Sequence, residues 1–304
     1  MHHLLSIHDL SREEIQEIFD LAADLKRRQR RGETHRLLEG KTLAMIFEKP
    51  STRTRVSFET GMAQLGGHPV VLNASDTQLG RGETIYDTAK VLSRYVDGIM
   101  ARTFAHDTVV QLAEHGSVPV INGLTDLLHP CQGLADYFTV GERFDGFEGL
   151  TLTYVGDGNN VAHSLLFGGA KLGVNVRVAT PEGYEPDPDV VLAAIKDAEA
   201  TGARIEILHD PVAAVKGVQV IYTDTWTSMG QEEEAVRRRK DLADFQVNAR
   251  LVKHAHDDAI VLHCLPAHRG EELTDEVMDG PQSAVFDEAE NRLHVQKAIM
   301  ALLM

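Results

Sequence analysis

The sequence is poor in cysteine and tryptophan, and it has no long hydrophobic stretch. Among its 304 residues there are two cysteines and one tryptophan. Because Cys131 and Cys264 could form at most one bridge, they are poor evidence for an oxidising compartment, and we expect both thiols to be reduced. No apolar run reaches the length of about 18 residues that suggests a membrane-spanning helix. Charged residues appear from Asp9 onward, so the start lacks the apolar core of a signal peptide, and we expect a cytoplasmic location.

Basic residues are also scarce. The chain has 30 Lys and Arg against 46 Asp and Glu, a formal net charge of −16, which argues against nucleic acid or an anionic membrane as its main partner. The excess of acidic residues is unevenly distributed along the chain. Residues 1–60 hold 11 basic and 10 acidic side chains, whereas the other 244 residues hold 19 basic and 36 acidic ones. A pocket for an anion is therefore expected near the first 60 residues.

The length predicts two domains of about 150 residues each. An apolar fraction of 43% and a charged fraction of 25% are typical of globular proteins and exclude a disordered chain. From Lys41 onward, short β-branched runs alternate with longer amphipathic ones, which predicts an α/β fold whose two domains each have a central, mainly parallel sheet flanked by helices. The expected strands are 42–47, 69–73, 98–102 and 118–122 in the first half, and 150–155, 175–179, 204–208, 218–223 and 259–263 in the second.

A helix from Cys131 to Arg143 is expected to link the two halves, because several glycines then interrupt the chain before the next strand. We predict a first domain over 1–130, a second over 131–286, and a last helix within 287–304 that returns to the first. The basic run Arg237–Lys240 is interpreted as a solvated loop, and a helix is predicted over 245–254.

The most informative segment is Phe47–Arg55, which follows a predicted strand and precedes a predicted helix. Ligands of open parallel sheets bind beyond the carboxyl ends of the strands, where this turn would lie. Ser51 or Thr52 can cap the helix, whose free N–H groups and positive dipole end favour an anion. The hydroxyl and guanidinium groups of the segment are suited to binding a phosphate. An ordinary capped helix with solvent-facing arginines is the alternative.

Five segments resemble the aspartate/ornithine carbamoyltransferase family. Residues 51–59, STRTRVSFE, are similar to the family's carbamoyl-phosphate signature, and His129-Pro130-Cys131-Gln132 is similar to its His-Pro-x-Gln turn. Three segments of the second half, 156–160, 224–230 and 263–267, resemble motifs of the ornithine-specific members. The resemblance implies an active site in the cleft between the two domains.

The resemblance implies a site for carbamoyl phosphate on the first domain. Its residues would be Ser51, Thr52, Arg53 and Thr54 at the phosphate, Arg102 and His129 at both the phosphate and the carbonyl oxygen, Gln132 at the carbamoyl amide, and Leu265 and Arg292 completing the site. Gln78 matches a loop that, in the homotrimers of this family, reaches the neighbouring subunit's site. The aspartate-specific members have a lysine on that loop where this chain has Gln78. The difference counts against aspartate as the acceptor.

The resemblance implies a second site, for L-ornithine. Asn160, Asp224, Ser228 and Met229 would hold its amino-acid end, with Cys264 and Leu265 beside the side-chain amine. Cys264, Arg102 and His129 would be the catalytic residues. The predicted reaction gives L-citrulline and phosphate, in arginine metabolism. The alternatives are a carbamoyltransferase for acetylornithine or putrescine, and a non-catalytic paralogue that binds anions.

The chemistry expected of such a site needs no metal or cofactor. Carbamoyl phosphate is already activated, so positioning and charge stabilisation suffice for direct attack by an amine. A covalent role for Cys264 is disfavoured, because an activated acyl phosphate gains little from a thioester intermediate. A metal cluster of His254, His256, His263 and Cys264 is also disfavoured, because the first two side chains would diverge and no zinc spacing fits.

Overall fold

The computed structural model describes residues 1–304 apart from 79–81, 228–229 and 231. The chain forms two units, one of residues 1–134 with 292–304 and the other of residues 135–291. Two helices, α5 (Pro130–Phe144) and α12 (Val285–Leu303), each contribute to both units. Each unit has a parallel sheet with helices around it, which confirms the predicted fold class. The predicted domain limits, 1–130 with 287–304 and 131–286, stay a prediction.

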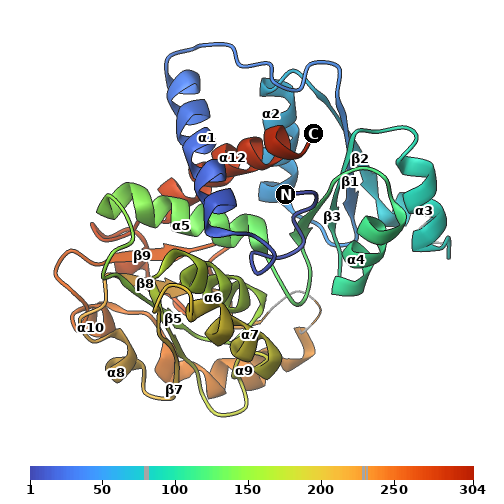
Figure 1. Ribbon diagram of the computed structural model, residues 1–304. Coiled ribbons are helices and arrows are strands. Elements are labelled where there is room, and N and C mark those ends of the chain that lie inside the picture. The colour runs from blue at the N-terminus through green and yellow to red at the C-terminus, as the bar shows by residue number, and fades with distance from the viewer. Residues whose placement is uncertain (79–81, 228–229, 231) are drawn as a thin grey trace. The chain divides into compact units, whose positions relative to one another are not determined.

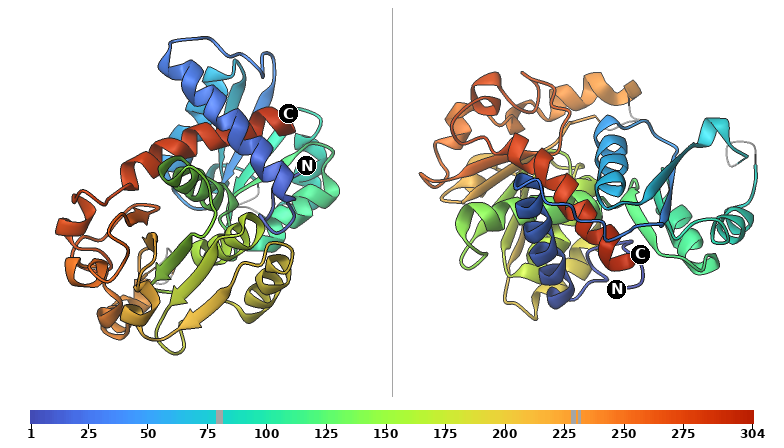
Figure 2. Two further views of the ribbon diagram at one scale, coloured as in Figure 1. Left: turned by 60° about the vertical axis from the view of Figure 1, so that its left-hand side comes forward. Right: turned by 90° about the horizontal axis from the view of Figure 1, so that it is seen from above.

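The first unit is built on a four-stranded parallel sheet in the order β2-β1-β3-β4. Its strands are β1 (Thr42–Phe47), β2 (His68–Asn73), β3 (Gly98–Arg102) and β4 (Val120–Leu124). Its other helices are α1 (Arg12–Arg30), α2 (Thr52–Gln64), α3 (Ile85–Leu92) and α4 (His106–His115). Buried residues of α3 and α4 pack on Ala44, Ile46 and Ile99 of the sheet. Helices α1, α2 and the end of α12 lie together on the other face (Figures 1 and 2).

The second unit has a five-stranded parallel sheet in the order β7-β6-β5-β8-β9. Its strands are β5 (Thr151–Val155), β6 (Asn175–Ala179), β7 (Ile205–Leu208), β8 (Val220–Thr223) and β9 (Ile260–His263). Its other helices are α6 (Asn160–Leu172), α7 (Pro188–Ala198), α8 (Pro211–Val215), α9 (Ala235–Asp241), α10 (Ala249–Val252) and α11 (Asp275–Met278). The nine predicted strands are all present, with ends within two residues of the prediction.

Each sheet has a point at which the strand order reverses. The chain leaves β1 for β2 on one side and later adds β3 on the other side of β1. In the second unit, β6 and β8 flank β5 in the same way. Loops that leave such neighbouring strands in opposite directions open a crevice at their carboxyl ends, which is where ligands of open α/β sheets bind.

Two predictions about the second unit were wrong. Residues 237–240 are part of helix α9 rather than a loop, and Arg238 is buried, although the other three side chains are exposed as predicted. The helix predicted over 245–254 is much shorter, because Val247 pairs in a β-bridge with Leu273 and the side chain of Asn248 then caps α10. Extended backbone at Val247 delays the start of the helix to Ala249.

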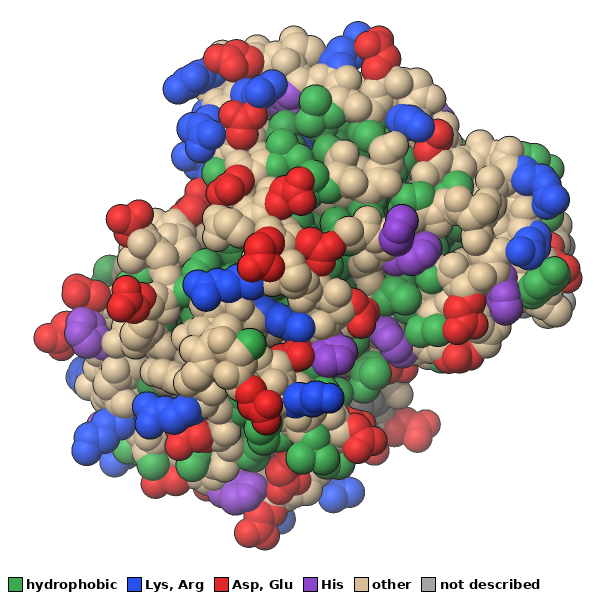
Figure 3. Space-filling model, in the orientation of Figure 1, with side chains coloured by type: hydrophobic (Ala, Val, Ile, Leu, Met, Phe, Trp, Pro, Cys, Tyr) green, Lys and Arg blue, Asp and Glu red, His purple; other side chains and the backbone are tan. Residues whose placement is uncertain are grey.

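Acidic and basic side chains are mixed over the face that Figure 3 shows. Within the described part of the chain, no helix combines the length and the apolar character needed to cross a membrane.

Candidate active site

The turn after β1 starts helix α2 and presents the predicted phosphate-binding residues. Ser51 is the N-cap, and its Oγ accepts a hydrogen bond from Thr54 N at 3.3 Å. Thr52 is the first residue of the helix, and the Arg53 side chain is half-buried. The sequence analysis predicted either Ser51 or Thr52 as the helix cap, and in the structure the cap is Ser51.

Two arginines from distant parts of the chain converge on Thr54. Its Oγ1 accepts hydrogen bonds from Arg292 Nη2 at 3.0 Å and from Arg102 Nη1 at 3.4 Å. Arg102 is the last residue of β3, Arg292 lies on α12, and all three side chains are buried. The two guanidinium groups add positive charge at a helix end that is already positive, so this cluster can hold an anion with two or more charges.

His129 and Gln132 belong to the same unit, just before α5 and in its first turn, and both are buried. Gln132 N donates to the carbonyl oxygen of His129 at 3.1 Å. Burial, and then the charges of Arg292 and Arg102, hold the pKa of His129 well below its usual 6.5. The imidazole is therefore neutral at neutral pH, and it can donate one N–H to an oxygen without acting as a strong acid.

The structure does not bring Gln78 into this cluster. Gln78 is exposed, and its carbonyl oxygen accepts from Glu83 N at 3.1 Å. For the residues that the structure describes, no hydrogen bond links Gln78 to Thr54, Arg102 or Arg292. Its predicted role depends on a neighbouring subunit and stays a prediction.

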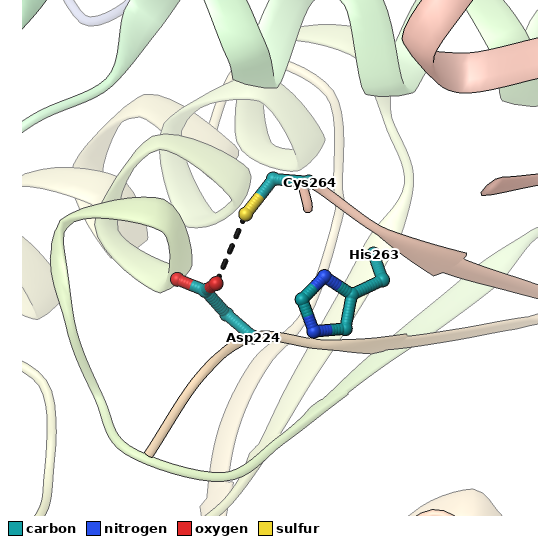
Figure 4. Close-up of side chains that lie close together, drawn as sticks. All are labelled: Asp224, His263 and Cys264. Atoms are coloured by element: carbon teal, nitrogen blue, oxygen red, sulfur yellow. Dashed lines mark hydrogen bonds between the residues drawn. The ribbon is translucent and has the colours of Figure 1, made fainter. Parts of the chain in front are cut away.

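In the second unit, Asp224 gathers side chains from the ends of three strands. Asp224 follows β8, Asn159 caps the helix after β5, and Cys264 follows β9. Asp224 Oδ2 accepts from Asn159 Nδ2 at 2.8 Å, and its Oδ1 accepts from Thr225 N at 2.8 Å. The same Oδ1 accepts from Cys264 Sγ at 3.0 Å, the contact that Figure 4 shows. Asn159 was missed by the sequence analysis, although it stands beside the predicted Asn160, the first residue of α6.

Cys264 is a protonated thiol in this setting. Burial, and then the negative charge of Asp224, raise the pKa of Cys264 well above its usual value of 9.0. The thiol donates to the carboxylate, which fixes both side chains. Because the thiolate is the nucleophilic form of cysteine, this geometry opposes covalent catalysis and suits a role in orienting a substrate.

Asp224, His263 and Cys264 lie close enough to suggest a metal site, since one ligand atom from each lies within 4.8 Å of the others (Figure 4). The ring of His263 is already engaged, however. Its Nδ1 accepts from Leu265 N at 2.9 Å, so Nε2 carries the proton and donates to Glu272 Oε1 at 3.0 Å. His263 therefore has no lone pair to offer a metal ion, and it instead holds the turn at Leu265.

Arg238 is a second residue that the sequence analysis missed. Its Nη1 donates to Asp157 Oδ2 at 2.8 Å and to the carbonyl oxygen of Trp226 at 3.2 Å, while its Nε donates to Glu234 Oε2 at 3.0 Å. Arg238 thus ties the loop after β5 to the loop after β8. Asp224 and Asn159 lie on these two loops, so Arg238 supports their contact.

Two predicted site residues, Ser228 and Met229, lie outside the described residues. The others fall into two groups. The first unit holds Ser51, Thr52, Arg53, Thr54, Gln78, Arg102, His129, Gln132 and Arg292, and the second holds Asn160, Asp224, Cys264 and Leu265. Apart from Gln78 and Arg292, these residues lie at the last residue of a strand, on the loop after it or at the start of the next helix, where the switch points predict ligands to bind.

Fold and site together define a two-unit α/β protein with two arginines gathered on Thr54 in one unit and a carboxylate–thiol cluster in the other. Comparison with known families gives the class. The carbamoyl-P binding domain of aspartate/ornithine carbamoyltransferase matches residues 2–142, and the Asp/Orn binding domain of the same family matches residues 148–303. The chain belongs to the aspartate/ornithine carbamoyltransferase family and is a carbamoyltransferase.

Its relatives carry a more specific name. The chain is 63% identical over 301 residues to ornithine carbamoyltransferase of Thermococcus kodakarensis, covering 99% of this chain and 96% of the relative. It is 62% identical over 301 residues to an anabolic ornithine carbamoyltransferase of Pyrococcus furiosus, with 99% and 96% covered. The solved structure of ornithine carbamoyltransferase from Pyrococcus furiosus superposes with a TM-score of 0.97 at 61% identity, covering 100% of this chain and 97% of that one.

Proposed function

We propose that this protein transfers the carbamoyl group of carbamoyl phosphate to the side-chain amine of L-ornithine, giving L-citrulline and phosphate in arginine biosynthesis. The observation that carries the proposal is the pair of clusters with opposite charge, two guanidinium groups on Thr54 and the carboxylate of Asp224 with its thiol partner. The first suits a phosphate dianion and the second an ammonium group. The names of the relatives, one of them anabolic, support the same reaction.

The proposed carbamoyl-phosphate site uses the positive cluster. Arg102, Arg292 and the start of α2 attract the phosphate, while neutral His129 donates an N–H to the carbonyl oxygen. The residues proposed to bind carbamoyl phosphate are Ser51, Thr52, Arg53, Thr54, Arg102, His129, Gln132, Leu265 and Arg292, with Gln78 from a neighbouring subunit of a homotrimer. Arg102, His129 and Cys264 are the proposed catalytic residues.

The proposed ornithine site uses the carboxylate of Asp224 to bind the α-ammonium group. Asn160, Ser228 and Met229 complete the amino-acid end, and Cys264 lies beside the side-chain amine. Asp224 is held from two sides by Asn159 and Cys264, so its carboxylate is oriented before substrate arrives. Acetylornithine lacks the free α-ammonium group that would pair with this carboxylate, and putrescine lacks the α-carboxylate of the amino-acid end.

The proposed chemistry is direct attack of a neutral amine on the carbonyl carbon. A C–N bond forms, the bond between the carbonyl carbon and the bridging oxygen breaks, and the amine's proton leaves with the phosphate. An alkylamine has a pKa of roughly 10.4, so about one molecule in a thousand is neutral near pH 7.4. The arginines stabilise the departing phosphate more than they stabilise the bound substrate, because charge builds on it as the bond breaks.

The location and assembly are part of the proposal. Both cysteines are free thiols, which supports a cytoplasmic protein. The exposed position of Gln78 leaves it available to a second copy, which supports the homotrimer implied by the family resemblance.

The proposal is tested by citrulline and phosphate assays with ornithine, acetylornithine, putrescine and aspartate as acceptors. We expect turnover with ornithine alone. Asp224→Asn keeps the shape of the side chain but removes its charge, so the KM for ornithine should rise by about tenfold or more while the Kd for carbamoyl phosphate stays nearly unchanged. Asp258→Asn, at an exposed position, is the matched control.

Three results would contradict the proposal. Phosphate release with acetylornithine at a rate equal to that with ornithine would remove the role of Asp224 in substrate choice. Equal damage to both substrates by Asp224→Asn would disprove the separation into two sites. Binding of both substrates without any citrulline would identify a non-catalytic protein.

A further inference from the structure

A buried lysine on α12 is left unused by the chemistry above. The side chain of Lys297 is fully buried. Its Nζ donates to Gln29 Oε1 at 2.7 Å and to Gln64 Oε1 at 2.9 Å, and it lies 3.1 Å from His35 Nε2. These acceptors come from the end of α1, the end of α2 and the loop between α1 and β1. Lys297 therefore joins three segments of the first unit to the last helix.

The hydrogen bonds around Lys297 form a complete set. His35 Nδ1 lies 3.0 Å from the carbonyl oxygen of Glu33, which can only accept, so Nδ1 carries the proton and Nε2 is an acceptor. The ammonium group then has three donors for three acceptors. All three acceptors are uncharged, so Lys297 is held by geometry rather than by an ion pair. An apolar side chain would avoid the desolvation of a charge but would leave these acceptors unpaired.

The same helix carries Arg292 into the anion-binding cluster. Arg292 lies five residues before Lys297, about 7.5 Å along the helix axis. Helix α2 contacts α12 over this stretch, because a Cβ at Gly61 would lie 2.9 Å from Met300 Cε and 3.2 Å from Lys297 Cγ. Since Thr54 lies on α2, the position of α12 on α2 decides whether Arg292 reaches the Thr54 hydroxyl.

We propose that Lys297 is a positioning residue for the phosphate site: by fixing α12 against α1 and α2, it holds Arg292 on Thr54. This role rests on the proposed function, because it takes carbamoyl phosphate as the ligand of that cluster. Lys297 itself does not touch the substrate. Its loss should therefore affect carbamoyl phosphate and leave ornithine binding alone.

The test is Lys297→Met, which keeps an unbranched side chain one atom shorter and removes the three hydrogen bonds of the ammonium group. We expect the KM and the calorimetric Kd for carbamoyl phosphate to rise by about tenfold, with the KM for ornithine changed by less than about twofold. Lys171→Met is the matched control: it removes a partly buried lysine from α6 of the other unit, where Lys171 pairs with Asp197 at 3.2 Å. The control should bind carbamoyl phosphate as the unchanged protein does.

A double-mutant cycle separates positioning from a general loss of structure. In an Arg292→Met background, Lys297→Met should weaken carbamoyl phosphate binding by no more than about a further twofold, because the contact it supports is already gone. If Lys297→Met fails to fold, Gln64→Met replaces it. That change removes one acceptor at a half-buried position, and about a threefold rise in the same Kd is expected.

Several outcomes overturn the proposal. The first is a folded Lys297→Met protein whose Kd for carbamoyl phosphate is unchanged. The second is a double variant whose rise in Kd equals the product of the rises caused by Lys297→Met and by Arg292→Met. If Lys297→Met does not fold, an unchanged Kd in Gln64→Met has the same consequence. If the unchanged protein does not bind carbamoyl phosphate, the proposed function fails first and this role fails with it.

Discussion

Removing Arg238 should destabilise the second unit and weaken its ornithine site. Arg238→Met would leave the carboxylate of Asp157, which is nearly buried, without its cation. Breaking one side of a buried ion pair costs about 3–5 kcal/mol. The contact with Glu234 adds little, because that side chain is 56% exposed. The expected loss of unfolding free energy is therefore about 3–5 kcal/mol.

The assay is urea unfolding followed by tryptophan fluorescence. Trp226 is the only tryptophan, it is buried, and its carbonyl oxygen accepts a hydrogen bond from Arg238, so the signal reports on this unit and this loop. Arg237→Met is the control. Arg237 is 76% exposed and pairs with Asp241, so its loss should cost less than about 1 kcal/mol.

A second substitution tests why Arg238→Met lowers the unfolding free energy. Adding Asp157→Asn to Arg238→Met removes the buried charge that the first change left unpaired, and it should restore part of the stability. The KM for ornithine should rise in Arg238→Met, because the loops that carry Asp224 and Asn159 lose their common anchor. If Arg238→Met unfolds at the same urea concentration as Arg237→Met, the ion pair does not support the site and the reasoning is wrong.

Three further predictions concern the two clusters and Lys297. Arg53→Ala should weaken carbamoyl phosphate binding by about 10- to 100-fold, since a charge-assisted contact is worth about 1.5–3 kcal/mol; an unchanged calorimetric Kd would disprove the contact. Cys264→Ser should keep measurable turnover and intersecting initial-rate lines, whereas parallel lines with a carbamoylated Cys264 in mass spectra would establish covalent catalysis. Burial lowers the pKa of Lys297 to about 8 from 10.5, so the unfolded chain binds more protons between these values. The unfolding free energy of the unchanged protein should therefore rise relative to Lys297→Met from about pH 8 to 10.5, and a constant difference would refute the shift.

The strands and the segment 51–55 could be predicted because their signals are local. Each strand is a short apolar run bounded by turn residues, and the serine at 51 caps the helix that directly follows it. Helix α1 also had a local signal that the analysis passed over. Ser11 and Glu14 form a capping box in which each side chain accepts from the other's backbone N–H. That spacing alone would have placed the start of the helix.

The missed residues have partners that are distant in the sequence. Arg238 stands within a run of basic residues, and the reason for its burial, Asp157, lies 81 positions earlier. Lys297 looks like an ordinary helix lysine until α1 and α2 are placed beside it. Periodicity and composition describe neighbours along the chain, so they cannot tell a solvated cation from one that the fold encloses.

The protonation states of the site residues explain why the proposed mechanism depends on positioning. His129 is kept neutral by burial and by two arginines, and Cys264 is kept protonated by burial and by Asp224. Neither group changes its charge near neutral pH, so neither supplies a proton-transfer step that would limit the rate there. The group that titrates is then the amine of ornithine itself, and the rate should follow the supply of neutral amine as the pH rises. An acidic chain can therefore use a dianionic substrate without general acid catalysis, because distant parts of its sequence bring Arg102 and Arg292 to one hydroxyl.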